Sequence, residues 1–286
     1  MDAPLTALVL GGVAWNTMVY VDAFPEPHPQ TVFPQRSHRT VGSSGAGKAL
    51  NLAGLGSDVT LWGLIGDDPE GEAIRAVFDQ AGVEFIGHAD PLGTERHTNL
   101  MDSSGERISI FVNAGSLDAE VDATFAEPLL AASDLVAITI KDHCRAFLEP
   151  ARRSGTPVWI DIHDYDGRNL YHRDFIEAAD HLMVSSVLLP GWRSFAEQRI
   201  EAGAEIVIVT HGADGASGID ATGTWVDVEA QPAEVVDTNG AGDAFFAGFA
   251  VARHAGADMG AAMEAGSDQA AAAVGSPDLA PKPRSG

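Results

Sequence analysis

Hydrophobic and polar positions alternate along the chain in a rhythm of short apolar runs separated by stretches with helical spacing. The apolar runs lie at residues 6–13, 57–64, 135–140, 158–162, 181–184 and 205–210. Continuous apolar runs of this length are typical of strands that are buried on both faces. Strands that alternate with helices predict a mostly parallel central sheet covered by helices on both sides, which is an α/β architecture. Ligands of such folds bind at the carboxyl ends of the strands.

Two segments depart from this rhythm. Residues 14–41 contain four prolines and alternate in polarity, which predicts a strand near 16–21 and a polar strand near 30–40. Residues 95–113 alternate with period two around a Ser104-Gly105 turn, which predicts a hairpin. We expect the two segments to pair in a small sheet. The predicted division is a large α/β domain of residues 1–13, 42–94 and 114–286 and a small β lid of residues 14–41 and 95–113.

The composition is that of an ordinary globular protein. The 286 residues are enough for one large domain with a small appendage, and 45% of them are hydrophobic against 20% charged. No apolar run reaches the roughly 18 residues of a membrane span. Residues 1–10 lack the basic start of a secretory signal, and the one cysteine, Cys144, excludes an internal disulfide. Both observations predict a cytoplasmic protein.

The charge balance excludes two classes of partner. A net charge of −24 leaves no basic surface to neutralise the phosphates of a nucleic acid. The same charge would be repelled by an anionic membrane surface. We therefore expect small-molecule partners.

The chemistry is concentrated in one segment, where a short apolar run is followed by Asp237-Thr-Asn-Gly-Ala-Gly-Asp243 and then by an apolar helix. A glycine turn that leads into a helix directs backbone N–H groups at an anion. An aspartate would repel a bound phosphate, so Asp243 needs a reason at this place. A base that takes the proton of an attacking hydroxyl, while the N–H groups hold a phosphoryl group, supplies that reason.

This segment resembles the D-T-x-G-A-G-D signature of the ribokinase-like (PfkB) carbohydrate kinase family, with six fixed positions in seven. Residues 42–56 are similar to the N-terminal pattern of the family, G-G-x-x-x-N-x-A-x-x-L-A-x-L-G, and residues 57–83 resemble its next strand, turn and helix. The resemblance spans nearly the whole chain. It implies a three-layer α/β/α fold with a small β lid, and a kinase that uses ATP and Mg²⁺.

The resemblance also implies roles for individual residues. Asp243 would be the catalytic base, and Gly240, Ala241 and Gly242 would form the anion hole with its backbone N–H. Asp237 and Thr238 would border a monovalent-cation site for K⁺. The nucleotide would lie beside Thr210, Gly212 and Gly215, with Asn239 near the adenine. Substrate contacts would come from Asn16, Gly42, Ser43 and Gly47.

The sequence departs from the family pattern at several of these places. Asn16 stands where the family usually has an aspartate, Ser43 replaces the second glycine, and Gly47 replaces an asparagine. The N-x-x-E pair that organises magnesium is missing after residue 184, and Asp161 or Asp164 is the best candidate to replace it. The cluster of His163, Asp164 and Asp166 is read as a solvated strand end, because its spacing is not a metal pattern.

Residues 42–49 also come close to a Walker A loop, but Ala49 stands where that loop needs Ser or Thr for magnesium. Without a P-loop, Lys48 is expected to be a solvated helix residue or, as the weaker alternative, a contact to an anionic substrate. The Pro-rich residues 276–286 are expected to be loop or tail.

The resulting prediction is a kinase that transfers phosphate from ATP to a hydroxyl of a small, free sugar. Arg96, Arg107 and Lys48 keep a sugar phosphate open as the acceptor. A nucleoside is the second choice, because Trp15, Phe33 or Phe111 could stack on a base. A catalytically weak sugar- or nucleotide-binding regulator is the alternative from another class. The lid sheet makes a homodimer plausible, since exposed sheet edges need cover.

Overall fold

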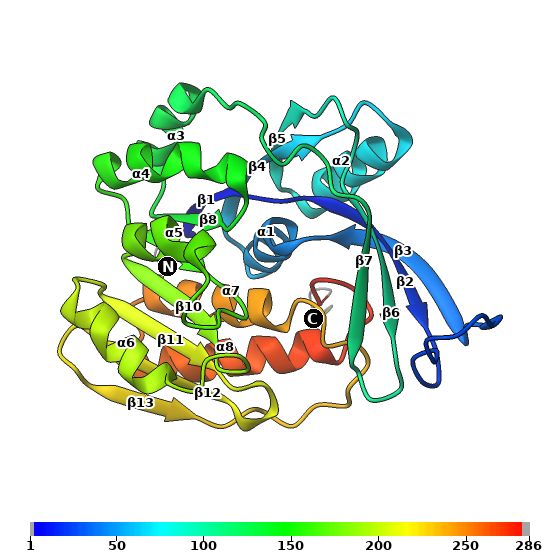
Figure 1. The fold of residues 1–286 in the computed structure, drawn as a ribbon. Helices are drawn as coiled ribbons and strands as arrows, with labels where there is room; N and C mark the ends of the chain where they lie inside the picture. The colour runs from blue at the N-terminus through cyan, green and yellow to red at the C-terminus, as the bar shows by residue number, and fades with distance from the viewer. Residues whose placement is uncertain (1–2, 282–286) are drawn as a thin grey trace.

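We analysed a computed structural model that describes residues 3–281. A nine-stranded sheet forms the centre of the molecule, in the order β13-β12-β11-β10-β9-β8-β1-β4-β5 (Figure 1). All neighbours pair in parallel except β11 with β12 and β12 with β13, which are antiparallel. The strands are β1 (Thr6–Leu10), β4 (Asp58–Ile65), β5 (Glu84–Ala89), β8 (Leu135–Thr139), β9 (Val158–Asp161), β10 (His181–Ser185), β11 (Ile206–Thr210), β12 (Ala216–Asp220) and β13 (Trp225–Val228). The predicted mostly parallel α/β architecture is confirmed.

Helices cover both faces of this sheet and bury two separate apolar clusters. One cluster joins the sheet to α1 (Ser44–Gly54), α2 (Pro69–Ala81), α7 (Ala241–His254) and α8 (Met259–Val274). The other joins it to α3 (Glu127–Ala132), α4 (Leu148–Ser154), α5 (Arg173–Ala178) and α6 (Trp192–Glu201). Short 3₁₀ turns occur at Ala123–Ala126, Asp142–Phe147, Leu170–His172 and Gly212–Asp214. None of the helices described within residues 3–281 is long and apolar enough to cross a membrane.

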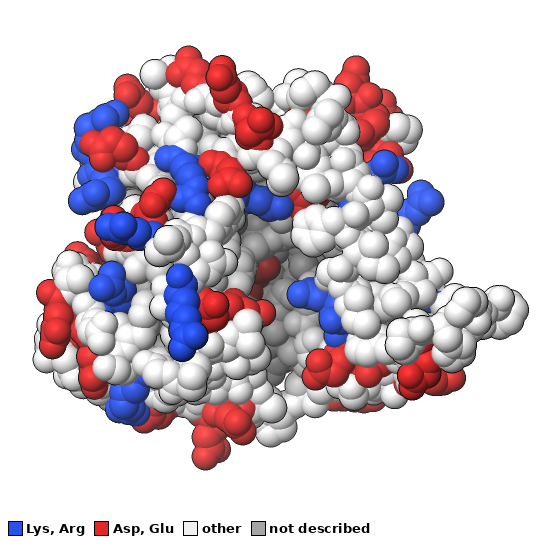
Figure 2. Space-filling model, in the orientation of Figure 1, with Lys and Arg blue, Asp and Glu red and all other residues white. Residues whose placement is uncertain are grey.

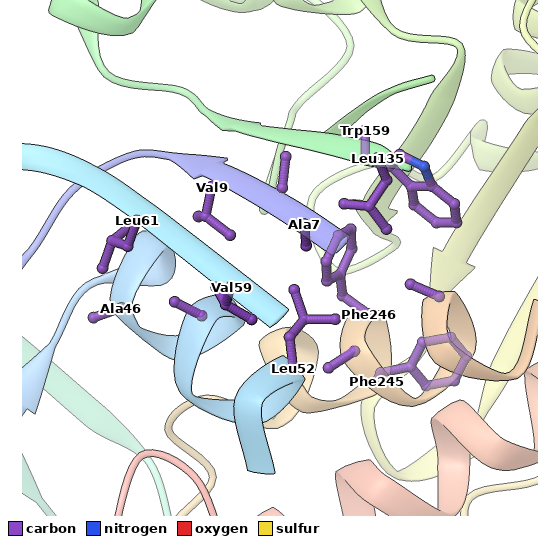
Figure 3. Close-up of a cluster of buried hydrophobic side chains, with 14 of the residues drawn as sticks. Ala7, Val9, Ala46, Leu52, Val59, Leu61, Leu135, Trp159, Phe245 and Phe246 are labelled. Atoms are coloured by element: carbon purple, nitrogen blue, oxygen red, sulfur yellow. The ribbon is translucent and has the colours of Figure 1, made fainter. Parts of the chain in front are cut away.

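The first cluster fixes the relative position of α1 and α7, which matters for the site. Figure 3 shows Leu52 of α1 beside Phe245 and Phe246 of α7, with side chains from β1 and β4 above them. These three side chains are at most 4% exposed. Burial of one such side chain stabilises the fold by about 1.5–3 kcal/mol. The N-terminal ends of both helices are therefore held against one rigid sheet.

The second sheet lies at one side of the central sheet and has four strands in the order β3-β2-β6-β7. They are β2 (Ala14–Tyr20), β3 (Arg36–Gly42), β6 (Arg96–Met101) and β7 (Arg107–Asn113), so the two segments that were set apart in the sequence pair here. Strand β3 begins at Arg36 and not near residue 30, because residues 22–35 form a mostly exposed loop with four prolines, which cannot donate to a ladder.

The segment after α8 is less peripheral than its proline content suggests. Leu279 is 4% exposed, and its carbonyl oxygen accepts a hydrogen bond of 3.3 Å from the Asn51 side chain of α1. The described part of this predicted tail therefore packs against the core. Residues 282–286 of it lie outside the described residues.

Candidate active site

A cavity of about 730 Å³ opens between the carboxyl ends of β8–β11, the small sheet and the start of α7. Figure 2 shows a hollow in the middle of one face, with acidic and basic side chains on both sides of it. Many of the residues singled out in the sequence line this cavity: Asn16, Ser43, Asp161, Asp164, Thr210, Thr238, Asn239, Gly240, Ala241, Gly242 and Asp243. The fold thus brings together residues that are more than 200 positions apart.

The glycine turn before α7 presents free N–H groups to the cavity. Gly240 adopts the left-handed conformation with φ 82°, and a side chain there would also meet the Leu279 carbonyl oxygen at 2.8 Å. Within residues 3–281, the backbone N–H groups of Gly242 and Asp243 have no acceptor. Unpaired N–H groups at a helix start favour a bound anion.

The carboxylate of Asp243 also lies at the start of α7, and two side chains of α1 hold one of its oxygens. Its Oδ1 atom accepts hydrogen bonds from Ser44 Oγ at 2.8 Å and from Lys48 Nζ at 2.6 Å. No group within residues 3–281 donates to its Oδ2 atom. One carboxylate oxygen is therefore anchored, and the other is free to accept a proton.

The expectation of a solvated Lys48 is wrong. Lys48 is 2% exposed and pairs with Asp161 at 3.1 Å as well as with Asp243. Burial alone would lower the pKa of the Lys48 ammonium, but the two carboxylates hold that pKa above its usual value. For the Asp161 carboxyl group the effects are reversed: burial alone would raise its pKa, but His163 and Lys48 lower that pKa to about 2.

Two glycines at the predicted substrate site act by making room and do not line the cavity themselves. A side chain at Gly47 would approach Asp243 Oδ2 to 2.1 Å. A side chain at Gly42 would meet the Asn16 amide nitrogen at 2.0 Å. Asn16 itself is 3% exposed and lines the cavity, and its Oδ1 atom has no hydrogen-bond partner within residues 3–281. A buried, unpaired amide oxygen favours a hydroxyl donor on a ligand.

Ser43 occupies the position where the resemblance has glycine. Its backbone has φ 77°, which a residue other than glycine rarely adopts. Ser43 directly precedes α1 and lines the cavity, and its Oγ lies where a side chain at Gly12 would be. The strained backbone is thus kept at the cavity wall, where strain of this kind is often found.

The sequence did not reveal a polar cluster on the small-sheet side of the cavity. Glu95 is 8% exposed and pairs with Lys141 Nζ at 2.7 and 2.9 Å and with His97 Nε2 at 2.8 Å. Burial would raise the pKa of Glu95, but His97 and Lys141 lower it below its usual value. The ring of Phe111 in β7 contacts that of His97 at 3.9 Å between ring centres, tilted by 43°. The period-two pattern could have placed Glu95, His97 and Asn99 on one face, but Lys141 comes from a distant loop.

The predicted cation-site residues contact the small sheet. Asp237 is 3% exposed, and it accepts hydrogen bonds from the Tyr20 hydroxyl at 2.7 Å and from the Asn239 N–H at 2.8 Å. Burial and the bond to Asp237 raise the pKa of Tyr20. Thr238 Oγ1 donates to the Gly105 carbonyl at 3.0 Å, and Arg107 contacts the Asn239 side chain. Residues 237–239 therefore join the small sheet to the glycine turn.

The other candidates are distributed as follows. Thr210 lines the cavity, whereas Gly212 and Gly215 shape the turn between β11 and β12 with φ 61° and 93°. Among the aromatic candidates, Phe111 lines the cavity, while Trp15 packs against the core and Phe33 is 86% exposed. Arg107 lines the cavity and Arg96 does not.

A magnesium ion at such a site would need few ligands from the protein. The described residues contain no group of three or more His, Cys, Asp or Glu side chains that could hold a metal ion. In phosphoryl-transfer sites, however, Mg²⁺ is usually bound by one or two carboxylates together with the substrate phosphates. Asp161 and Asp164 both line the cavity, and Asp164 has no ion pair with the described residues. The residues present therefore fit a nucleotide-bound magnesium ion.

Comparison with known proteins gives a consistent result. Residues 12–284 match the description "pfkB family carbohydrate kinase". The chain is 31% identical to the acarbose 7(IV)-phosphotransferase of Actinoplanes sp. over 90% of this chain and 87% of that one. It is 34% identical to the ATP-dependent ribose-1-phosphate kinase of Halopiger xanaduensis over 90% and 88%. The structure superposes on the microbiome-derived acarbose kinase Mak1 with a TM-score of 0.87 and 29% identity, covering 96% of this chain and 94% of the other.

These similarities favour an enzyme over the regulator considered as an alternative. The relatives are phosphotransferases that act on hydroxyl groups, and they share the fold over nearly the whole length of the chain. The chain belongs to the pfkB family of carbohydrate kinases and is a phosphotransferase with a hydroxyl group as acceptor.

Proposed function

We propose that the protein phosphorylates a hydroxyl group of a free sugar or a sugar-like polyol with ATP, and that Asp243 is the base. One observation carries the proposal: an Asp243 oxygen and the backbone N–H groups of Gly242 and Asp243 lie together at the start of α7, and none of them has a hydrogen-bond partner within residues 3–281. A proton acceptor and an anion-binding turn at one point are what transfer of a phosphoryl group to a hydroxyl requires.

In this mechanism the Oδ2 atom of Asp243 takes the proton of the acceptor hydroxyl as its oxygen attacks the γ-phosphorus. The bond from that phosphorus to the bridging oxygen breaks, and ADP leaves. The N–H groups of the turn stabilise the charge on the transferred group. Magnesium, when bound with ATP, would neutralise phosphate charge, and Asp164, which lines the cavity and has no ion pair with the described residues, would be its protein carboxylate. Asn16 would accept a hydrogen bond from a second hydroxyl of the acceptor.

The charge of the cavity favours an uncharged acceptor over a sugar phosphate. Lys141 is paired with Glu95, and Lys48 is buried behind Asp243 and paired with two carboxylates. Arg107 contacts Asn239, next to the glycine turn, where the donor phosphates would bind. A phosphate on the acceptor would therefore find no unpaired lysine among the described residues of the cavity.

The test is a panel of acceptors with ATP and MgCl₂, in which ADP formation is measured. We expect turnover with a free sugar or with acarbose, the substrate named for two of the relatives, and little with ribose 1-phosphate. The variant Asp243→Asn should lose at least about 10²-fold in kcat, the low end for a positioned base, while it retains ATP binding. Near-normal turnover of this variant would exclude Asp243 as the base.

A nucleoside is the second candidate acceptor. Phe111 is an aromatic side chain of the cavity wall and lies beside His97, so a base could stack there. Turnover with adenosine or inosine that exceeds turnover with every sugar of the panel would favour this candidate.

Two further properties are part of the proposal. We propose that two copies associate through β7, because Ile108, Ile110 and Val112 on this edge strand are each more than 40% exposed. Light scattering in solution checks this, and a monomer at micromolar concentration would contradict it.

We also propose a cytoplasmic location, since the donor ATP is found there, and K⁺ binding near Asp237 and Thr238.

A further inference from the structure

Lys48 is a buried charged group that the mechanism above does not use. It lies in the second turn of α1, directly behind Asp243, and it is not among the residues that line the cavity. Its ammonium contacts three oxygens: Asp243 Oδ1 at 2.6 Å, Ser44 Oγ at 2.8 Å and Asp161 Oδ2 at 3.1 Å. Substrate therefore does not reach Lys48, and any effect of Lys48 on the reaction must act through its partners.

We propose that Lys48 is a positioning residue for phosphoryl transfer, which holds Oδ1 of Asp243 so that Oδ2 faces the acceptor hydroxyl. This inference rests on the proposed role of Asp243 as the base. The geometry supports it because the two side chains that donate to the Asp243 carboxylate within residues 3–281, Lys48 and Ser44, bind the same oxygen. A carboxylate held at one oxygen by two donors cannot rotate freely, and misplacement of a reacting group by 1 Å can cost about 10²-fold in rate.

Gly47 is part of the same arrangement. The free Oδ2 atom lies against its backbone, since a side chain at position 47 would approach that oxygen to 2.1 Å. Gly47 therefore provides the space for the carboxylate, and Lys48 provides the contact that fixes it. Gly47, which departs from the family pattern, and its neighbour Lys48 thus serve one structural purpose.

Lys48 also ties the base to the sheet. Asp161 ends β9 and accepts a hydrogen bond from the His163 N–H at 2.9 Å, so it is itself fixed. Through Lys48, the start of α7 is connected to the end of β9 across the cavity floor. A purely structural reading is that Lys48 only neutralises two buried carboxylates. The two interpretations predict different kcat values for a variant in which the Lys48 charge and one carboxylate charge are removed together.

The experiment therefore removes one charge of each sign. Lys48→Met alone leaves two buried carboxylates without a counter-charge and is expected to fold poorly. The double variant Lys48→Met/Asp161→Asn is compared with Asp161→Asn, in which Lys48 still holds Asp243. If Lys48 is a positioning residue, the folded double variant has kcat at least about 10-fold below that of Asp161→Asn, with the KM for ATP within about threefold. Equal kcat values in the two folded variants would overturn the proposal.

A second measurement does not depend on turnover. In a crystal structure of the double variant, we expect the Asp243 carboxylate in a rotated or split orientation, whereas Asp161→Asn keeps it as in the native protein. A single unchanged orientation in both would overturn the proposal. If no acceptor gives turnover with the native protein, the proposed function fails, and the crystallographic comparison alone decides the role of Lys48.

Discussion

At the scale of single residues, the site depends on Gly47, which has no side chain. Gly47→Ala adds one carbon that would press on Asp243 Oδ2. Alanine is favoured over glycine in a helix by about 1 kcal/mol, so the change should not weaken α1 by itself. We expect kcat to fall at least about 10-fold because the proposed base is displaced.

The matched control is Gly54→Ala in the same helix, where an added carbon has no neighbour within 4 Å. This variant should retain full kcat and gain a little stability. Steady-state kinetics and thermal unfolding of both variants provide the comparison. Equal kcat in Gly47→Ala and Gly54→Ala would show that the carboxylate does not need the space beside Gly47.

A second residue, His143, makes the stability depend on pH. It is 8% exposed beside Trp62, and burial, followed by the charge of Lys141, lowers its pKa to about 4. The unfolded chain binds a proton near pH 6.5 and the folded protein does not, so stability is present above pH 6.5 and is lost as the pH falls to about 4. The shift corresponds to about 3 kcal/mol.

Denaturant unfolding of His143→Leu between these two pH values should show a smaller loss of stability than the native protein shows. His28→Leu, at an exposed position, serves as the control and should follow the native curve. Parallel curves for all three proteins would contradict the assignment to His143.

The sequence predicted the local structure of the glycine turn better than the contacts around it. The order of residues in 237–243 is enough to indicate an anion-binding turn, because the geometry is local. The contact of Lys48 with Asp243 joins residues 195 positions apart and depends on how α1 crosses α7. Because lysine usually occupies exposed positions, the sequence predicted that Lys48 lies at the surface. Nothing in the sequence indicated that two carboxylates would lie close enough to allow its burial.

At the scale of elements, the small sheet is attached to the segment directly before the glycine turn. Tyr20→Phe removes the hydroxyl that donates to the buried Asp237. An acceptor that loses its partner in a buried place costs about 1–3 kcal/mol. We expect this loss of stability in denaturant unfolding and a higher KM for the acceptor, because the small sheet is held less firmly over the cavity.

Tyr165→Phe is the control, because the Tyr165 hydroxyl has no hydrogen bond to the part of the chain that the structure describes. An equal loss of stability in both variants, or none in Tyr20→Phe, would contradict a role of Tyr20 in joining the two parts.

Strands were predictable in proportion to their burial on both faces. The runs that became β1, β4 and β8–β11 are continuous and apolar, so their pattern was sufficient. Strands β5 and β13 are the two edge strands of the sheet, and they carry a weaker pattern because they are partly exposed. Strand β12 is buried between β11 and β13, but its five residues, Ala-Ser-Gly-Ile-Asp, include one large apolar side chain and form no apolar run.

At the scale of the whole molecule, the architecture followed from the alternation of strands and helices together with the family resemblance. The sequence also gives the net charge of −24, which arises from 41 acidic against 17 basic residues. Figure 2 shows acidic side chains spread over the visible face and not gathered in one patch. Repulsion among them disfavours the compact state, and dissolved salt screens it, since the Debye length falls from about 30 Å at 0.01 M to about 3 Å at 1 M.

We therefore expect the Tm to rise by at least about 3 °C between about 0.01 M and about 1 M NaCl, which corresponds to roughly 1 kcal/mol for a chain of this size. Choline chloride should have the same effect if the cause is screening alone. A larger rise with KCl than with either salt would in addition support the proposed cation site near Asp237 and Thr238. A Tm that stays constant or falls in all three salts would show that charge repulsion does not limit the stability of this fold.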